Sequence, residues 1–88
     1  MEILKIASQH PLTKEFMREN PLYKSKVTFL DETALRSLIA TSPAIYSNIN
    51  SKEIYKVEYN SEKEGIMLLI DPTTKTVVKY FRVKEIKV

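Results

Sequence analysis

The chain has 88 residues, a formal net charge of +3, an apolar fraction of 43%, one glycine and no cysteine. This length accommodates one domain with a single core, and the absence of cysteine excludes disulfides and thiolate chemistry. No segment approaches the roughly 20 apolar residues of a transmembrane helix, and the N-terminal MEILKI is too short and too charged for a signal peptide. A cytoplasmic protein with one domain over residues 1–88 is the simplest interpretation.

The first twenty residues predict at least one helix. Residues 2–6 (EILKI) are too few to distinguish a strand from a helix. Pro11 suits the first position of a helix, because its missing N–H is not needed there. We expect this helix to end at Glu19, since Asn20 precedes a proline and is disfavoured in the helical conformation. Its apolar side consists of Leu12, Phe16 and Met17.

The clearest helix signal begins at Asp31. Residues 21–26 read as a polar connector, and residues 26–30 (KVTFL) as a short strand or an extended segment. Asp31 is a favourable N-cap, and Leu30 can pack against Leu35 across it. The apolar stripe of the helix is Leu35, Leu38 and Ile39, and we expect it to stop near Ser42, before Pro43.

The last third of the chain reads as three strands separated by turns. Residues 54–59 (IYKVEY) alternate, residues 66–71 (IMLLID) are apolar for five positions, and residues 76–83 (TVVKYFRV) are β-branched and aromatic. A run that is apolar on both faces belongs in the middle of a sheet, so residues 66–71 are predicted as the central strand of an antiparallel meander. We therefore predict an α+β fold in which two short N-terminal helices cover one face of this sheet.

The sequence contains no motif of a cofactor or metal enzyme. It lacks a P-loop, GxGxxG, HExxH and GxSxG, and one histidine with scattered acids cannot build a histidine-rich metal site or a carboxylate pair. We therefore expect no cofactor and no metal. The chemistry that remains needs only a histidine, a tyrosine and a few cations.

Three residues are candidate catalytic groups. His10 stands at a helix start, which suits either a proton shuttle or an N-cap, since histidine ordinarily titrates near neutrality. Tyr80 and Arg82 are two apart on the last strand and so share a face. There the arginine can hold a phosphate while the tyrosine stacks on a base or handles a proton; the alternative is cross-strand packing with an exposed arginine. The residues expected on the opposite, core face are Val77, Phe81 and Val83.

Four further residues are candidate substrate-binding groups: Arg18, Tyr55, Lys56 and Lys79. The C-terminal stretch is the most basic part of the chain, with Lys75, Lys79, Arg82, Lys84 and Lys87 against Glu85. A phosphate-bearing or acidic partner is therefore expected to dock on the face with Tyr80 and Arg82, together with Lys56 and His10. In that arrangement, loss of Arg82 weakens binding and barely changes stability, because an exposed charge contributes little to folding.

Three segments carry a resemblance to a known family: HPLTKEFMR at a helix start, LDETALRSLIATSP ending in a proline stop, and the final hairpin IMLLIDPTTKTVVKYFRV. Over residues 8–83 this order of elements resembles the barnase–RelE-like superfamily of small ribonucleases and toxins. The resemblance implies metal-independent RNA cleavage, in which a 2′-hydroxyl attacks the neighbouring phosphate. It implies His10 as acid or base, Arg18 or Arg82 as phosphate holder, and Tyr80 as a supporting group.

Three classes of function remain open. The first is a toxin-type ribonuclease or RNA-binding protein, which would cleave RNA in EDTA and lose activity on changing His10 or Arg82. The second is a non-enzymatic interaction module or inhibitor, viral or antitoxin-like, which docks an acidic protein through a sheet face or edge. The third is a sequence-tolerant nucleic-acid binder with strongly salt-dependent affinity. An edge strand also offers a place for two copies to form a homodimer, and we expect no membrane partner.

Overall fold

The computed structural model describes residues 2–84. Glu85 and Lys87, counted above in the basic C-terminal stretch, lie outside this range. The elements in chain order are α1 (Glu2–Gln9), α2 (Pro11–Glu19), β1 (Lys24–Leu30), α3 (Glu32–Thr41), α4 (Pro43–Tyr46), β2 (Ile54–Asn60), β3 (Glu64–Asp71) and β4 (Thr76–Lys84). None of the helices in this range is long and apolar enough to cross a membrane.

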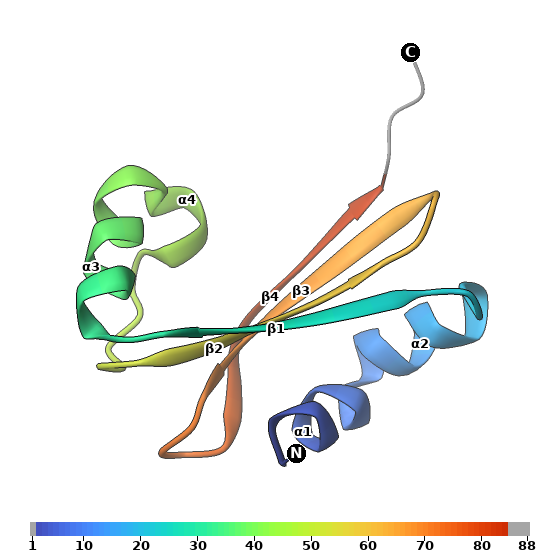
Figure 1. Ribbon diagram of the computed structural model, residues 1–88, viewed down its shortest axis with the longest axis horizontal. Coiled ribbons are helices and arrows are strands. Elements are labelled where there is room, and N and C mark those ends of the chain that lie inside the picture. The colour runs from blue at the N-terminus through green and yellow to red at the C-terminus, as the bar shows by residue number, and fades with distance from the viewer. Residues whose placement is uncertain (1, 85–88) are drawn as a thin grey trace.

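The strands form one antiparallel sheet in the order β1-β2-β3-β4 (Figure 1). The predicted meander is therefore confirmed, with β3 between β2 and β4. Its residues Leu68, Leu69 and Ile70 are fully buried, as expected of a strand covered on both faces. Residues 26–30, which the sequence assigned either to a short strand or to an extended segment, belong to β1. This strand begins two residues earlier, at Lys24.

Residues 2–6, which the sequence alone did not assign, belong to helix α1. Ile3 and Ala7 are its buried residues, one turn apart, and this spacing places both on one helix face. Both predicted helix starts are confirmed. The Asp31 side chain accepts a hydrogen bond from the Ala34 N–H at 2.8 Å, and Pro11 is the first residue of α2. Pro43 ends α3 and begins the short helix α4.

The helices cover both faces of the sheet, so the prediction that they cover one face is wrong. Helices α1 and α2 lie on one side, here called face A, and α3 and α4 lie on the other, face B (Figure 1). Each side has its own apolar core, so the expectation of a single core is wrong. The buried core of face A is Ile3, Ala7, Phe16, Val57, Tyr59, Ile66, Leu68 and Ile70. The buried core of face B is Leu30, Leu35, Tyr46, Ile54 and Leu69.

A register shift in β4 moves one predicted core residue to the other face. Leu69 pairs with Lys79 while Ile70 pairs with Val77, so Val78 is the extra residue of a β-bulge. Val77 therefore packs against the core of face A, on the same side as Tyr80. The prediction that it faces the same way as Phe81 is wrong, because a bulge breaks the strict alternation on which it rested.

Candidate functional site

Two of the predicted catalytic residues, His10 and Tyr80, are in contact. Their ring centroids lie 4.8 Å apart with the planes tilted by 52°. His10 precedes α2, where its Nδ1 accepts a hydrogen bond from the Leu12 N–H at 3.1 Å, so a neutral His10 carries its proton on Nε2. Tyr80 is 57% exposed on β4. The pair thus combines an N-capping histidine with a solvent-accessible phenol.

Arg82 lies beside this pair, but its guanidinium is held by three carboxylates. It donates to Glu64 through Nε at 2.8 Å and Nη2 at 2.9 Å, to Glu19 through Nη2 at 2.7 Å, and to Glu15 through Nη1 at 2.6 Å. The side chain is 21% exposed. The hydrogen bonds with these carboxylates raise the pKa of Arg82 above its ordinary value, and the bonds with Glu64 have the largest effect.

This arrangement changes what Arg82 can do. Three carboxylates around one guanidinium give the cluster an excess of negative charge, so a phosphate approaching it meets repulsion from the acids. The cluster also ties α2 to β3 and β4, since Glu15 and Glu19 belong to the helix. The sequence reasoning missed these acids. The sequence feature that could have identified Glu15 and Glu19 is their spacing of four residues, which places both on one side of α2.

The same network extends to Asn20, another residue that the sequence reasoning did not select. Its amide nitrogen donates to the Phe16 carbonyl at 3.0 Å and to Glu64 Oε2 at 2.8 Å, and its carbonyl accepts from Ser61 Oγ at 2.8 Å. Asn20 is buried, and a buried amide needs such partners. The end of α2 is therefore fastened to the turn between β2 and β3.

The other candidate residues do not gather around His10. Arg18 is exposed on α2, and Tyr55 lies on face A next to the ring of Phe29, at 5.0 Å. Lys56 and Lys79 are in one cross-strand row with the face-B residue Leu69, and Lys79 Nζ donates to the Ile45 carbonyl at 3.1 Å. Lys56 is thus on the opposite face from Tyr80 and Arg82, and the expected grouping of these residues is wrong.

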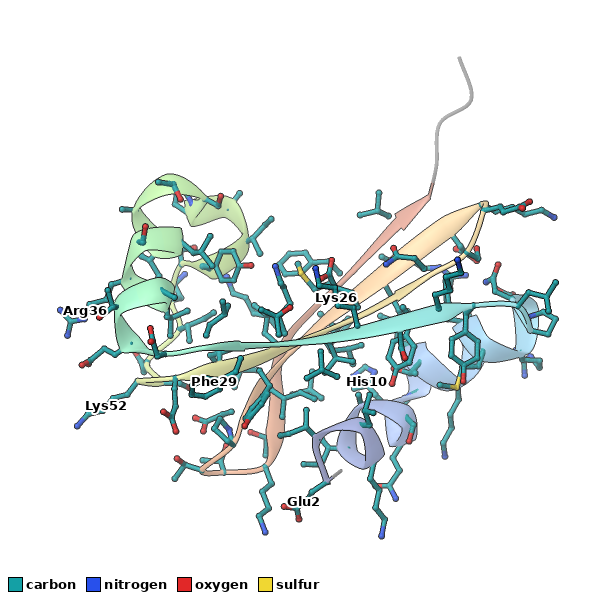
Figure 2. All side chains as sticks on the ribbon, viewed as in Figure 1. Glu2, His10, Lys26, Phe29, Arg36 and Lys52 are labelled. Atoms are coloured by element: carbon teal, nitrogen blue, oxygen red, sulfur yellow. The ribbon has the colours of Figure 1, made fainter. Side chains whose placement is uncertain are left out.

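One end of face B is left uncovered by α3 and α4. Directly opposite residues of antiparallel strands share a face, so Lys26 and Met67 lie on face B in one row with Phe81, and Glu58 of β2 stands between Lys26 and Met67. In the next row lie Lys24 and Val83. The name open patch is used for Lys24, Lys26, Met67, Phe81 and Val83. In Figure 2, Lys26 projects to the side of β1 on which α3 lies, whereas His10 lies on the side of α1.

The open patch combines apolar and basic side chains. Met67 and Phe81 are half-buried, Val83 is 66% exposed, and both lysines are exposed. A third row on face B, which begins at Thr28 on β1, adjoins the two rows of the patch. Together the three rows carry four lysines and one glutamate: Lys24, Lys26, Lys56, Lys79 and Glu58. Charge is therefore separated between the faces, since the Arg82 cluster on face A has an excess of acids.

No cluster of three or more histidines, cysteines or acids that could hold a metal ion is found within residues 2–84. Comparison of the chain with protein-family models, curated protein sequences and solved structures gives no match. The resemblance to the barnase–RelE-like superfamily is therefore neither supported nor contradicted by a relative.

Proposed function

We propose that this protein is a non-enzymatic interaction module that binds an acidic, amphipathic helix of a partner protein on the open patch. The observation that carries the proposal is the combination of apolar and basic side chains at one end of face B. There Met67 and Phe81 pack at the margin of the core under α3 and α4 and stay half-buried, and Val83 is 66% exposed, next to the exposed Lys24 and Lys26. An apolar strip beside free charge is typical of the centre and rim of an interface.

The dimensions of the sheet suit one helix. The lysines stand on β1, and the apolar residues stand on β3 and β4. Three strand spacings of about 4.8 Å separate β1 from β4 by about 14 Å, and a helix about 10–12 Å across can bridge this width. Its apolar stripe would bury Phe81 and Val83, while its acids would pair with Lys24 and Lys26 and orient the helix on the patch.

The side chains favour a protein over a nucleic acid as the occupant. Binding of single-stranded nucleic acid uses exposed aromatic rings on which bases stack. The patch has one aromatic residue, Phe81, which is half-buried, and its other apolar members, Met67 and Val83, are aliphatic. Aliphatic side chains suit burial against leucine, isoleucine or methionine of a partner.

The test is a selection of helical peptides from a displayed library, with the wild-type chain as bait and a double variant, Lys26→Glu with Val83→Glu, as counter-bait. We expect the peptides enriched on the wild type to carry an apolar stripe flanked by acids. Their dissociation constants should rise by at least about tenfold on the double variant, since each 1.4 kcal/mol corresponds to a factor of ten. The matched control is Leu22→Glu, because Leu22 is a 91% exposed apolar residue outside the patch.

Two outcomes would overturn this proposal. One is the enrichment of the same peptides on both baits, which would locate their binding elsewhere. The other is the absence of any enriched peptide together with salt-dependent binding of an oligonucleotide to the wild type, which would assign the basic face to nucleic acid.

A second candidate, metal-independent ribonuclease activity, is favoured by the contact between His10 and Tyr80. His10 would act as acid or base through Nε2, and Tyr80 would be its supporting group. Arg18 would hold the phosphate, because Arg82 is bound to three carboxylates. The test is RNA cleavage in the presence of EDTA by the wild type and by His10→Ala. Absence of cleavage by the wild type, or equal cleavage by both chains, would end this candidate.

A further inference from the structure

We infer that two copies of this chain pair through the outer edges of β4, antiparallel and with two-fold symmetry, so that the two sheets become one. Strand β4 stands at the end of the strand order, and no strand among residues 2–84 pairs with its outer side. The backbone N–H and C=O groups along such an edge need partners, and another edge strand supplies them.

The side chains along β4 favour pairing. Five large apolar residues are exposed within the described part of the chain, and three of them are on this strand: Val78 at 39%, Tyr80 at 57% and Val83 at 66%. After the bulge at Val78, the strand pairs regularly with β3 from Lys79 to Lys84. This segment therefore has an unbroken register, as pairing with another strand requires.

The charges of the two edges differ in a way that selects β4. Natural sheets oppose unwanted pairing with free lysines on an edge strand. On β1, Lys24 and Lys26 are exposed, and neither is in an ion pair within residues 2–84. On β4, Lys79 is bound to the Ile45 carbonyl and Arg82 to its three carboxylates. Lys79 and Arg82 are thus bound within their own chain, so the part of the β4 edge between them lacks the free lysines that protect β1.

This charge pattern also identifies the occupant as a second copy. A two-fold axis near Tyr80 places this residue beside its own symmetry mate, and it places Lys79 of each copy near Phe81 of the other. No free like charges then face each other, which is a requirement for a self-complementary interface. The inference does not depend on the proposed function. Because the two-fold axis is perpendicular to the sheet, both open patches would lie on the same side of the combined sheet.

The experiment is light scattering coupled to size-exclusion chromatography over a series of concentrations. We expect the wild type to approach twice the 10.2 kDa mass of the chain. Tyr80→Lys should raise the dimer dissociation constant by at least about tenfold, because two lysines would be desolvated side by side at the axis. Val78→Lys should act in the same direction. Since both residues are exposed, circular dichroism should show unchanged secondary structure.

The control variants are Ser25→Lys on the β1 edge and Leu22→Lys outside the strands, both at exposed positions. Neither should change the dimer. A wild type that stays at the mass of one chain at all concentrations would overturn the inference. A dimer that survives both β4 variants, or that dissociates in Ser25→Lys, would also overturn it. Val83 is common to both proposals, whereas Tyr80→Lys and Val78→Lys leave all five residues of the open patch unchanged. Loss of the dimer in these two variants with retained peptide binding therefore separates the two proposals.

Discussion

At the scale of single residues, Arg82 shows how its surroundings decide what a cation does. By sequence it resembles an exposed, anion-binding residue. In the folded chain it joins α2 to β3 and β4 through Glu15, Glu19 and Glu64, and its side chain is 21% exposed. Hydrogen bonds to charged groups are the stronger ones in proteins, so we assign Arg82 to the stability of the fold rather than to a phosphate.

This assignment predicts that Arg82→Met destabilises the protein. Three neighbouring carboxylates would lose their shared cation and repel one another, which should cost about 1–3 kcal/mol of unfolding free energy in urea titrations. The matched control is Arg18→Met, since Arg18 is exposed on α2 and should stay within about 0.5 kcal/mol of the wild type. Equal effects of the two variants would show that the cluster contributes nothing. Adding Glu64→Gln to Arg82→Met should recover part of the loss.

At the scale of secondary-structure elements, local signals placed the helix and strand ends well. Asp31 is a good example, because a capping aspartate acts on an N–H group three residues away, here that of Ala34. Strand β4 shows the opposite case, since its bulge comes from pairing with β3. A bulge leaves no clear trace in an alternating pattern such as TVVKYFRV, so Val77 was assigned to the wrong face.

The cap at Asp31 predicts a modest, specific effect. Asp31→Ala should lower the unfolding free energy by about 1 kcal/mol, because the Ala34 N–H loses its acceptor. Asp31→Ser should retain most of the stability, since serine caps about as well as aspartate. Thermal melts of the three chains measure this. If alanine and serine give the same melting temperature, the side-chain hydrogen bond does not stabilise α3.

At the scale of the whole molecule, the sheet divides the protein into two cores and two charge environments. Tyr59 lies in the core of face A and is 2% exposed. Burial, together with the neighbouring hydroxyl of Tyr23, raises the pKa of Tyr59 above its ordinary value of 10.0. The folded protein therefore keeps this proton at pH values at which the unfolded chain loses it.

The sign of the resulting pH dependence follows from linkage. The stability associated with neutral Tyr59 is fully present below pH 10.0 and is lost as pH rises through the higher, folded-state pKa. We expect the unfolding free energy to begin to fall above about pH 9, and to fall less steeply in Tyr59→Phe. Lysine titration is common to both chains and cancels in the comparison. Parallel curves would mean that Tyr59 ionises equally in both states.

The sequence by itself determined the parts of the fold that depend on near neighbours. The apolar run of residues 66–71 specified a central strand, because only a strand buried on both faces tolerates it. Asp31, Pro11 and Pro43 specified helix ends through one hydrogen bond or one missing N–H. Residues 2–6 were left unassigned, since five residues span too little of either period.

Only the tertiary structure decided which residues meet. Arg82 is 67 residues from Glu15, 63 from Glu19 and 18 from Glu64, and no local pattern encodes such pairings. Lys56 and Tyr80 were separated onto opposite faces by the register of β2, β3 and β4. The open patch likewise exists because α3 and α4 cover only one end of face B. Periodicity and caps act within a few residues, whereas these features depend on how distant elements pack.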